Sequence, residues 1–166
     1  MKVSILIPVY GVERYIETCV RSLMEQTYHD IEYIFVNDCT PDDSITILRK
    51  IVALYSNRIE QVRIIDHEKN KGLGAARKTS LNYATGDAVL IVDSDDYLHQ
   101  QAVELLVRKM QETKADIIDG GFALVSNGVI SKHIKPSHLS TQTYLKRILC
   151  QNIEPYRIWG RLISRS

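Results

Sequence analysis

The alternation of apolar runs with amphipathic segments constrains the fold more than any other feature of this chain. Four short, nearly continuous apolar runs, typical of strands buried on both faces, lie at residues 2–9, 31–37, 61–66 and 87–93. After each run, apolar residues recur at helical spacing, which predicts helices over residues 12–27, 43–56, 73–84 and 99–113. Strands that alternate with helices indicate βαβ units. We therefore predict an α/β fold with a mainly parallel, doubly wound sheet and flanking helices.

The pattern changes after residue 115. Residues 115–126 read as one longer strand, and Asn127-Gly128 is a strong two-residue hairpin signal. Residues 129–134 would then return antiparallel, and a polar loop would lead to a last helix at 141–151. No internal repeat or change of composition divides the chain. We expect a single domain over residues 1–166 that ends in a C-terminal antiparallel hairpin.

Composition excludes several classes of protein. Apolar residues make up 45% of the 166 residues and charged residues 25%, which is ordinary for a soluble globular domain. The net charge of +1 gives no indication of a nucleic-acid partner. No apolar run could span a bilayer, and the N-terminal run is too short for a signal peptide, so we expect a cytoplasmic protein. The cysteines match neither a zinc site nor a disulfide framework, and Cys19 and Cys150 are expected in the core.

Three carboxylates follow the fourth apolar run within four positions: Asp93, Asp95 and Asp96. Crowded carboxylates repel one another and resist desolvation. A divalent cation, Mg²⁺ or Mn²⁺, held by Asp93 and Asp95 would remove this conflict, because hard cations take oxygen ligands and keep positions open for substrate phosphates. The alternative is that Asp95 or Asp96 simply caps the next helix.

Polar residues also follow the other predicted strands. In an open α/β sheet, ligands bind at the carboxyl ends of the strands. The predicted strands end at Pro8-Val9-Tyr10-Gly11, Asn37-Asp38, Asp66-His67 and Asp93. We expect these residues to meet along one edge of the sheet, and no side chain at the opposite edge stands out in the same way.

Each of these strand-end residues has two interpretations. An ionised Asp38 only accepts hydrogen bonds, so it could accept one from the N3–H of uracil, or it could cap the turn at 38–44. Tyr10 could stack on a base or pack under the first loop. His67 is interpreted as an ordinary loop histidine, because the sequence offers it no obvious partner.

The phosphate-binding signals are weak. The chain has no GxxxxGK[ST] motif, and no GxGxxG motif follows the first strand, which argues against a nucleoside triphosphatase and a dinucleotide-dependent oxidoreductase. Lys71-Gly72-Leu73-Gly74 precedes a predicted helix and is either a phosphate loop or a turn. Lys71 or Arg77 could add positive charge beside a diphosphate, or each could lie on a solvated surface.

Four segments, in this order, resemble the family-2 glycosyltransferases of GT-A fold. They are SILIPVYGVERYIETCVRSLMEQTY (4–28), DIEYIFVNDCTPDDS (30–44), NKGLGAARKTSLNYATGD (70–87) and AVLIVDSDDYL (88–98). The resemblance implies that a sugar moves, with inversion, from a nucleotide-sugar donor, often a UDP-sugar, to a hydroxyl acceptor. It implies that Asp93 and Asp95 bind the metal–diphosphate. The predicted nucleotide-sugar-binding residues are Pro8, Val9, Tyr10, Asp38, Lys71, Arg77, Asp93 and Ser94.

The chain departs from the family pattern in two places. Cys39 replaces a glycine that the family often has after the acid, which limits backbone freedom at this turn. In relatives the general base lies well after the segment that contains Trp159, so we expect the base beyond Ser166 and expect the chain to be a truncated, donor-binding part that transfers sugar poorly. Asp116, Asp119 and Glu154 are the fallback candidates for the base.

The acceptor is less constrained than the donor. At the level of the family, the expectation is a saccharide or a lipid-linked saccharide at the inner face of the membrane, for polysaccharide synthesis. The sequence gives no basis for an oligomeric state. Three other functions stay open: a non-catalytic nucleotide- or sugar-binding module, a nucleotidyltransferase on a related fold, and a flavodoxin-like signalling domain.

Overall fold

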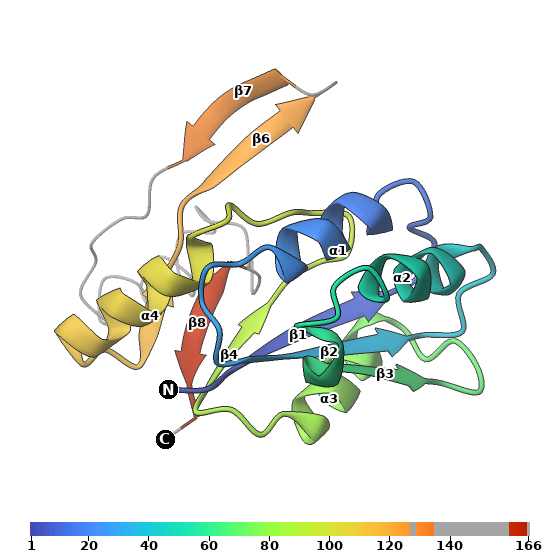
Figure 1. Cartoon of the computed structure of the whole chain (residues 1–166), viewed down its shortest axis with the longest axis horizontal. Coiled ribbons are helices and arrows are strands. Elements are labelled where there is room, and N and C mark those ends of the chain that lie inside the picture. The colour runs from blue at the N-terminus through green and yellow to red at the C-terminus, as the bar shows by residue number, and fades with distance from the viewer. Residues whose placement is uncertain (127–128, 135–159, 166) are drawn as a thin grey trace, which may run out of the picture.

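A six-stranded sheet with strand order β3-β2-β1-β4-β8-β5 forms the centre of the molecule (Figure 1). The computed structural model describes residues 1–126, 129–134 and 160–165. Four strands are parallel: β1 (Val3–Val9), β2 (Ile31–Asn37), β3 (Val62–Asp66) and β4 (Ala88–Ile91). They confirm the four predicted strands, although β4 ends before Asp93. The carboxyl ends of these strands therefore share one edge of the sheet.

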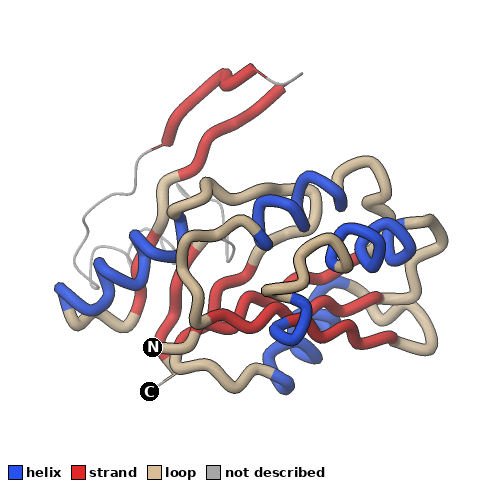
Figure 2. The backbone as a smooth tube through the Cα atoms, viewed as in Figure 1, coloured by secondary structure: helices blue, strands red, loops and turns tan. Residues whose placement is uncertain are grey.

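Helices cover both faces of the sheet, as a doubly wound fold requires (Figure 2). The helices are α1 (Ile16–Met24), α2 (Ser44–Val52), α3 (Leu73–Tyr83) and α4 (Ala102–Thr113), with a short 3₁₀ helix η1 (Ile59–Gln61) before β3. Apolar residues of α1, α2 and α4 share one buried cluster, and Ala76 of α3 belongs to a second. All four predicted helices exist, but α1 begins four residues later than the apolar pattern suggests, because residues 13–15 form a turn.

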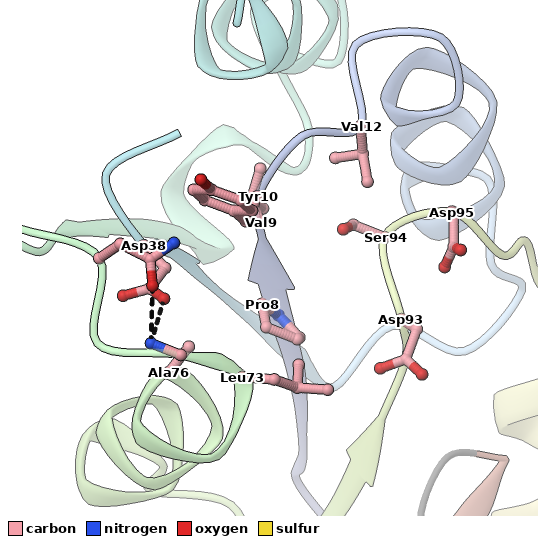
Figure 3. Close-up of a pocket in the computed structure, with 12 residues that line it drawn as sticks. Pro8, Val9, Tyr10, Val12, Asp38, Leu73, Ala76, Asp93, Ser94 and Asp95 are labelled. Atoms are coloured by element: carbon pink, nitrogen blue, oxygen red, sulfur yellow. Dashed lines mark hydrogen bonds between the residues drawn. The ribbon is translucent and has the colours of Figure 1, made fainter. Parts of the chain in front are cut away.

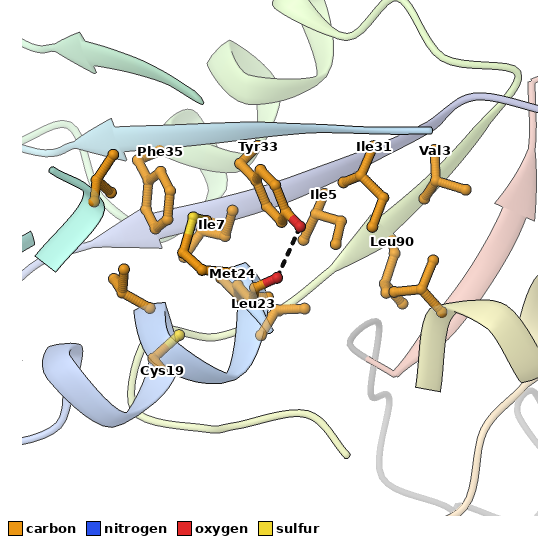
Figure 4. Close-up of a cluster of buried hydrophobic side chains, with 14 of the residues drawn as sticks. Val3, Ile5, Ile7, Cys19, Leu23, Met24, Ile31, Tyr33, Phe35 and Leu90 are labelled. Atoms are coloured by element: carbon orange, nitrogen blue, oxygen red, sulfur yellow. Dashed lines mark hydrogen bonds between the residues drawn. The ribbon is translucent and has the colours of Figure 1, made fainter. Parts of the chain in front are cut away.

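The two clusters lie on opposite faces of β1 and β2, which explains why these strands are almost entirely apolar; Figure 4 shows the larger cluster. Successive side chains of a strand point to opposite faces, so a strand covered on both faces needs apolar residues throughout. Tyr33 is fully buried in this cluster, and its hydroxyl donates to the carbonyl of Leu23 at 2.7 Å. Cys19 is a core residue as predicted, and burial, followed by the negative charges of Asp96, Asp95 and Asp93, raises its pKa to about 12. Cys150 lies outside the described residues.

The prediction of one strand over residues 115–126 is wrong. The segment divides into β5 (Ile117–Asp119), which joins the central sheet, and β6 (Phe122–Ser126), which pairs with β7 (Val129–Ile134) in a separate antiparallel hairpin. The two strands part at Gly120, which lies so close to Gly160 that an added Cβ would be 2.8 Å from the Gly160 carbonyl oxygen. The predicted hairpin itself is confirmed, and it projects beyond the central sheet (Figure 1).

Strand β8 (Arg161–Ser164) was not among the predicted elements. It lies between β4 and β5 and is antiparallel to both, so the sheet is mainly rather than wholly parallel. The predicted loop at 135–139 and the helix at 141–151 lie outside the described residues. Among the residues that are described, no helix is both long and apolar enough to cross a bilayer.

The amino edge of the parallel strands holds a buried acid, contrary to our expectation for that edge. Glu32, near the start of β2, is 4% exposed. Its carboxylate accepts hydrogen bonds from the Ser4 hydroxyl, from the N–H and hydroxyl of Thr85 and from the N–H of Gly86, and it pairs with Lys2 at 2.9 Å. Burial alone would raise the pKa of Glu32, but these donors lower it to about 2. This acid is saturated by the protein itself.

Candidate functional site

A cavity of about 340 Å³ lies at the carboxyl edge of the sheet (Figure 3). Asp38 lies on one side of it, Asp93, Ser94 and Asp95 lie on the other, and Pro8 is between them. Its lining residues come from the ends of β1, β2 and β4 and from the start of α3: Pro8, Val9, Tyr10, Val12, Asp38, Asn70, Gly72, Leu73, Ala76, Asp93, Ser94 and Asp95. The structure thus brings together most of the predicted site residues. Lys71 and Arg77 are not among the residues that line the cavity.

The loop after β1 is held in place by the turn that follows β2. The N–H of Gly11 donates to the Thr40 hydroxyl at 2.8 Å, and the N–H of Val12 donates to the Ser44 hydroxyl at 3.1 Å. Asp42 fixes the turn in return, because its carboxylate accepts from the hydroxyls of both Thr40 and Ser44. Burial opposes ionisation of Asp42, but these bonds lower its pKa to about 2. The loop is therefore preorganised at the mouth of the cavity.

Tyr10 lies on this loop and lines the cavity. Its side chain is 50% exposed, so the interpretation that it packs under the first loop is wrong. An exposed aromatic ring beside a cavity presents a face on which a planar ring can stack. Gly11, which follows it, has a φ of 69°, a conformation that glycine adopts without strain.

Asp38 directly follows β2 in the chain and is buried, with 3% of its surface exposed. Its Oδ1 accepts from the N–H of Lys71 at 2.9 Å and its Oδ2 from the N–H of Gly72 at 2.7 Å. Asp38 therefore holds the loop before α3, and the interpretation that it caps the turn at 38–44 is wrong. Burial would raise the pKa of Asp38, but hydrogen bonds from His67 and from the two main-chain groups lower it below its ordinary value. The carboxylate is ionised and can only accept.

His67 is not the ordinary loop histidine that we expected. It follows β3, is 8% exposed, and its Nδ1 lies 2.6 Å from Oδ1 of Asp38. Its Nε2 lies 2.9 Å from the hydroxyl of Thr79 on α3. The sequence could not reveal these partners, because the three residues come from three different elements.

Asp93 and Asp95 form the other side of the cavity. Asp93 pairs with Arg77, whose Nη2 lies 2.6 Å from Oδ1, so the interpretation of Arg77 as a solvated residue is wrong. Asp95 is exposed. Neither Asp95 nor Asp96 caps the next helix, because Gln101 occupies the N-cap position of α4. Partial desolvation, followed by the charges of Asp95 and Asp93, raises the pKa of Asp96, as expected for crowded carboxylates.

The segment before α3 contributes more to the cavity than the sequence suggested. Gly72 is the N-cap residue of α3 with a φ of 85°, and its N–H is shared by Asp38 and the side-chain oxygen of Asn70. The N–H groups of Lys71 and Gly72 in this segment donate to Asp38, and its use as a phosphate loop stays a prediction. The lining residues that sequence reasoning did not assign to the site are Val12, Asn70, Gly72, Leu73 and Ala76. The side chain of Lys71 is exposed, and its charge role stays a prediction.

The fallback candidates for a general base do not line this cavity. Asp119 lies in β5, where its carboxylate is 3.5 Å from Nε of Arg161. Asp116 is exposed just before β5. Glu154 lies outside the described residues. Within the part of the chain that the structure describes, the acids that line the cavity are Asp38, Asp93 and Asp95.

The chain is similar in sequence to known glycosyltransferases. The chain is 41% identical over 120 residues to the uncharacterized glycosyltransferase EpsJ of Bacillus subtilis (strain 168), which covers 72% of this chain and 33% of EpsJ. It is 40% identical over 121 residues to the glycosyltransferase GlyA of Streptococcus pneumoniae serotype 4, which covers 73% of this chain and 17% of GlyA. The chain therefore spans a third or less of the length of these two relatives.

A solved structure shares the fold. Residues 1–349 of S. aureus TarS, in complex with UDP, superpose with a TM-score of 0.64 at 30% identity, over 70% of this chain and 34% of that one. This likeness confirms the expected GT-A fold. The sequence model of glycosyl transferase family 2 matches residues 4–165. With that match over nearly its whole length, the chain belongs to glycosyl transferase family 2.

Proposed function

We propose that this chain binds a nucleotide-sugar donor, a UDP-sugar, in the cavity and belongs to an enzyme that transfers the sugar to a hydroxyl acceptor with inversion. The TarS fragment to which it is similar has been solved with UDP and with UDP-GlcNAc. A further relative, 38% identical over 72% of this chain, is a poly(ribitol-phosphate) beta-glucosyltransferase of Bacillus spizizenii. These names support a role in cell-surface polysaccharide synthesis, with a saccharide or lipid-linked saccharide as acceptor.

One observation carries the proposal: the same cavity has an aromatic ring and a hydrogen-bond acceptor on one side and two further carboxylates on the other. Tyr10 and Asp38 suit a nucleobase, because the ring can stack and the ionised carboxylate can accept from a base N–H. Asp93 and Asp95 suit a cation that carries a diphosphate. A nucleoside diphosphate has these two chemistries at its two ends.

The acidic side fits a divalent cation of the Mg²⁺ or Mn²⁺ type. Asp93 and Asp95 would hold it with carboxylate oxygens, which hard cations prefer. Arg77 pairs with Oδ1 of Asp93 and so competes with a cation for that oxygen. Among the described residues no group of three or more His, Cys, Asp or Glu side chains could hold a metal, so diphosphate oxygens and water would supply the other ligands. When bound, such a cation offsets the negative charge that develops on the departing diphosphate.

Inverting transfer needs an acceptor hydroxyl that attacks the sugar C1 from the face opposite the diphosphate, and a base that takes its proton. Asp38 accepts three hydrogen bonds from the protein, Asp93 and Asp95 are assigned to the cation, and Asp116 and Asp119 lie away from the cavity lining. We therefore assign donor binding, and not proton abstraction, to the described acids. The base is proposed to come from another part of the enzyme.

Thermal unfolding in the presence of UDP, GDP, CDP and UDP-sugars, each with Mn²⁺, Mg²⁺ or EDTA, tests donor binding. Specific binding stabilises the folded state by mass action. We expect UDP and UDP-sugars with Mn²⁺ to raise the unfolding temperature most. Equal shifts for all nucleotides, or none, would contradict the proposal.

An assay of UDP release then separates an enzyme from a binding module. With a UDP-sugar and saccharide acceptors, the full-length protein should release UDP faster than this chain alone. A full-length protein that binds UDP-sugars with metal but releases no UDP with any acceptor would favour the non-catalytic binding module.

A further inference from the structure

We propose that His67 and Thr79 are positioning residues for the nucleobase: they hold Asp38 as a fixed hydrogen-bond acceptor, so that the site selects a base with a ring N–H, such as uracil, over cytosine. This inference rests on the proposed function, because it concerns the same nucleotide-binding site. Neither residue lines the cavity, so both act through Asp38.

A continuous chain of hydrogen bonds joins the three residues across three elements. Asp38 follows β2, His67 follows β3 and Thr79 lies in α3. An ionised carboxylate accepts only, so Nδ1 of His67 carries the proton that it donates to Oδ1 of Asp38 at 2.6 Å. Nε2 of His67 lies 2.9 Å from the hydroxyl of Thr79, which can either donate to or accept from a ring nitrogen, so Thr79 holds the far side of the ring in place. The side chains of Asp38 and His67 are each 4% exposed, so water competes little for these bonds.

The protein occupies most, but not all, of the acceptor positions of Asp38. A carboxylate offers about four lone-pair positions. His67 and the N–H of Lys71 take two on Oδ1, and the N–H of Gly72 takes one on Oδ2. About one acceptor position is left on Oδ2, and Asp38 lines the cavity. A ligand must therefore donate to Asp38.

The contact with His67 affects the protonation of the buried Asp38. Burial alone favours a protonated carboxyl, which could donate as well as accept. Hydrogen bonds from His67 and the two main-chain N–H groups outweigh burial and lower the pKa of Asp38. Uracil presents an N–H donor at ring position 3, whereas cytosine presents an acceptor there, which an ionised Asp38 repels. Without the His67 donor, Asp38 would lose part of its preference for the ionised, accepting form.

The test compares dissociation constants for UDP and CDP, measured by calorimetry with Mn²⁺ at one pH, in the wild type and four variants. His67→Leu removes the donor, and His67→Asn keeps an N–H near the position of Nδ1. Thr79→Val removes the hydroxyl at nearly constant shape, and Thr79→Ser keeps it. Because a bond to a charged group contributes strongly, we expect His67→Leu to lower the UDP-over-CDP preference about 10-fold or more. His67→Asn and Thr79→Ser should retain most of it, and Thr79→Val should lower it about 3-fold.

The ratio of the two affinities distinguishes positioning from general stability, because loss of folded protein weakens both nucleotides equally. Unfolding temperatures of all variants accompany the titrations, and Thr79→Val decides the matter if His67→Leu does not fold. An unchanged UDP-over-CDP ratio in His67→Leu and Thr79→Val would overturn the inference and leave the proposed function intact. A wild type that binds UDP and CDP equally would also overturn it. A wild type that binds neither would contradict the proposed function itself.

Discussion

The two ends of the parallel sheet both hold buried or partly buried acids, but the protein treats them differently. At the amino edge, Glu32 accepts four hydrogen bonds and pairs with Lys2, so its acceptor positions are filled. At the carboxyl edge, among the described residues, the carboxylate of Asp93 has one side-chain partner, Arg77, and that of Asp95 receives no hydrogen bond. Saturated acids hold a fold together, whereas acids with unused oxygens at a cavity are available to a ligand.

Asp38 lies between these extremes. It accepts three hydrogen bonds from the protein and still lines the cavity. It therefore both fixes the loop before α3 and keeps capacity for a ligand. The comparison shows that the location of an acid at a strand end is not enough to assign a function. The number of acceptor positions left unfilled is the more informative property.

We expect the largest loss of stability from a mutation of Glu32, the acid at the amino edge whose acceptor positions are filled. Glu32→Gln keeps the shape of the side chain but replaces one acceptor oxygen by a donor that faces Thr85 and Lys2. Removing the charge from a buried, fully paired acid should lower the free energy of unfolding by about 3 kcal/mol. Chemical denaturation with urea measures this loss. If Glu32→Gln is as stable as the wild type, the hydrogen bonds of Glu32 do not hold the amino edge.

Acid unfolding tests the same end without a mutation. The folded-state pKa of Glu32 is about 2, below its ordinary value of 4.5, so the folded state binds its proton less readily than the unfolded state. Its contribution to stability is therefore complete above about pH 4.5 and is lost as the pH falls towards 2. Urea denaturation from pH 6 to pH 2.5 should show this decline, and it should be much shallower in Glu32→Gln. Equal slopes for the two proteins would contradict the assignment.

The next largest effect is expected on ligand binding at the carboxyl edge, where Asp95 accepts no hydrogen bond from the described residues. Asp95→Asn should weaken UDP binding in the presence of Mn²⁺ by about 10-fold or more, because it removes a charged ligand from the proposed cation site. Asp96→Asn is the matched control: it removes the neighbouring charge, but Asp96 does not line the cavity. Both variants should unfold within about 0.5 kcal/mol of the wild type. Calorimetric titration with UDP checks the affinities, and equal losses in both variants would argue for a general charge effect.

A smaller effect is expected on the affinity for Mn²⁺ when Asp93 loses its ion-pair partner. Arg77→Gln removes the guanidinium that pairs with Asp93 at 2.6 Å. Without this competing charge, Mn²⁺ alone should bind about 2-fold to 5-fold more tightly, by the size of a partly exposed ion pair. Electron paramagnetic resonance of free Mn²⁺ measures the affinity. Weaker Mn²⁺ binding in Arg77→Gln would mean that Arg77 organises the carboxylate for the cation.

The smallest effect concerns the turn next to Asp38. Cys39 has a φ of 57°, the left-handed region that favours glycine. Cys39→Gly should raise the free energy of unfolding by at most about 1 kcal/mol, because relief of backbone strain is partly offset by the greater freedom of glycine in the unfolded chain. Thermal and urea unfolding measure the change. A clear loss of stability would show that the Cys39 side chain makes contacts that outweigh the strain.

The sequence predicted the parts of this molecule that depend on local pattern. Burial on one or both faces accounts for the apolar runs of β1 and β2 and for the apolar stripe of α1, so these elements could be predicted. The site after β4 could be predicted because three acids within four positions are visible in the sequence itself. The four residues of β8 were missed, because a short strand is defined by the β4 and β5 partners that it pairs with and not by its own pattern. The partners of His67 and Glu32 were missed for the same reason, since each hydrogen-bonds residues distant in the chain.

The central claim is that Asp93 and Asp95 hold a cation that in turn holds a diphosphate. A crystal grown with UDP and Mn²⁺ tests it most directly, because the anomalous signal locates manganese independently of the nucleotide. We expect an anomalous peak at ligand distance from the carboxylates of Asp93 and Asp95 and from diphosphate oxygens, with the nucleobase near Asp38. Manganese at another place, or a diphosphate that contacts only main-chain amides, would contradict it.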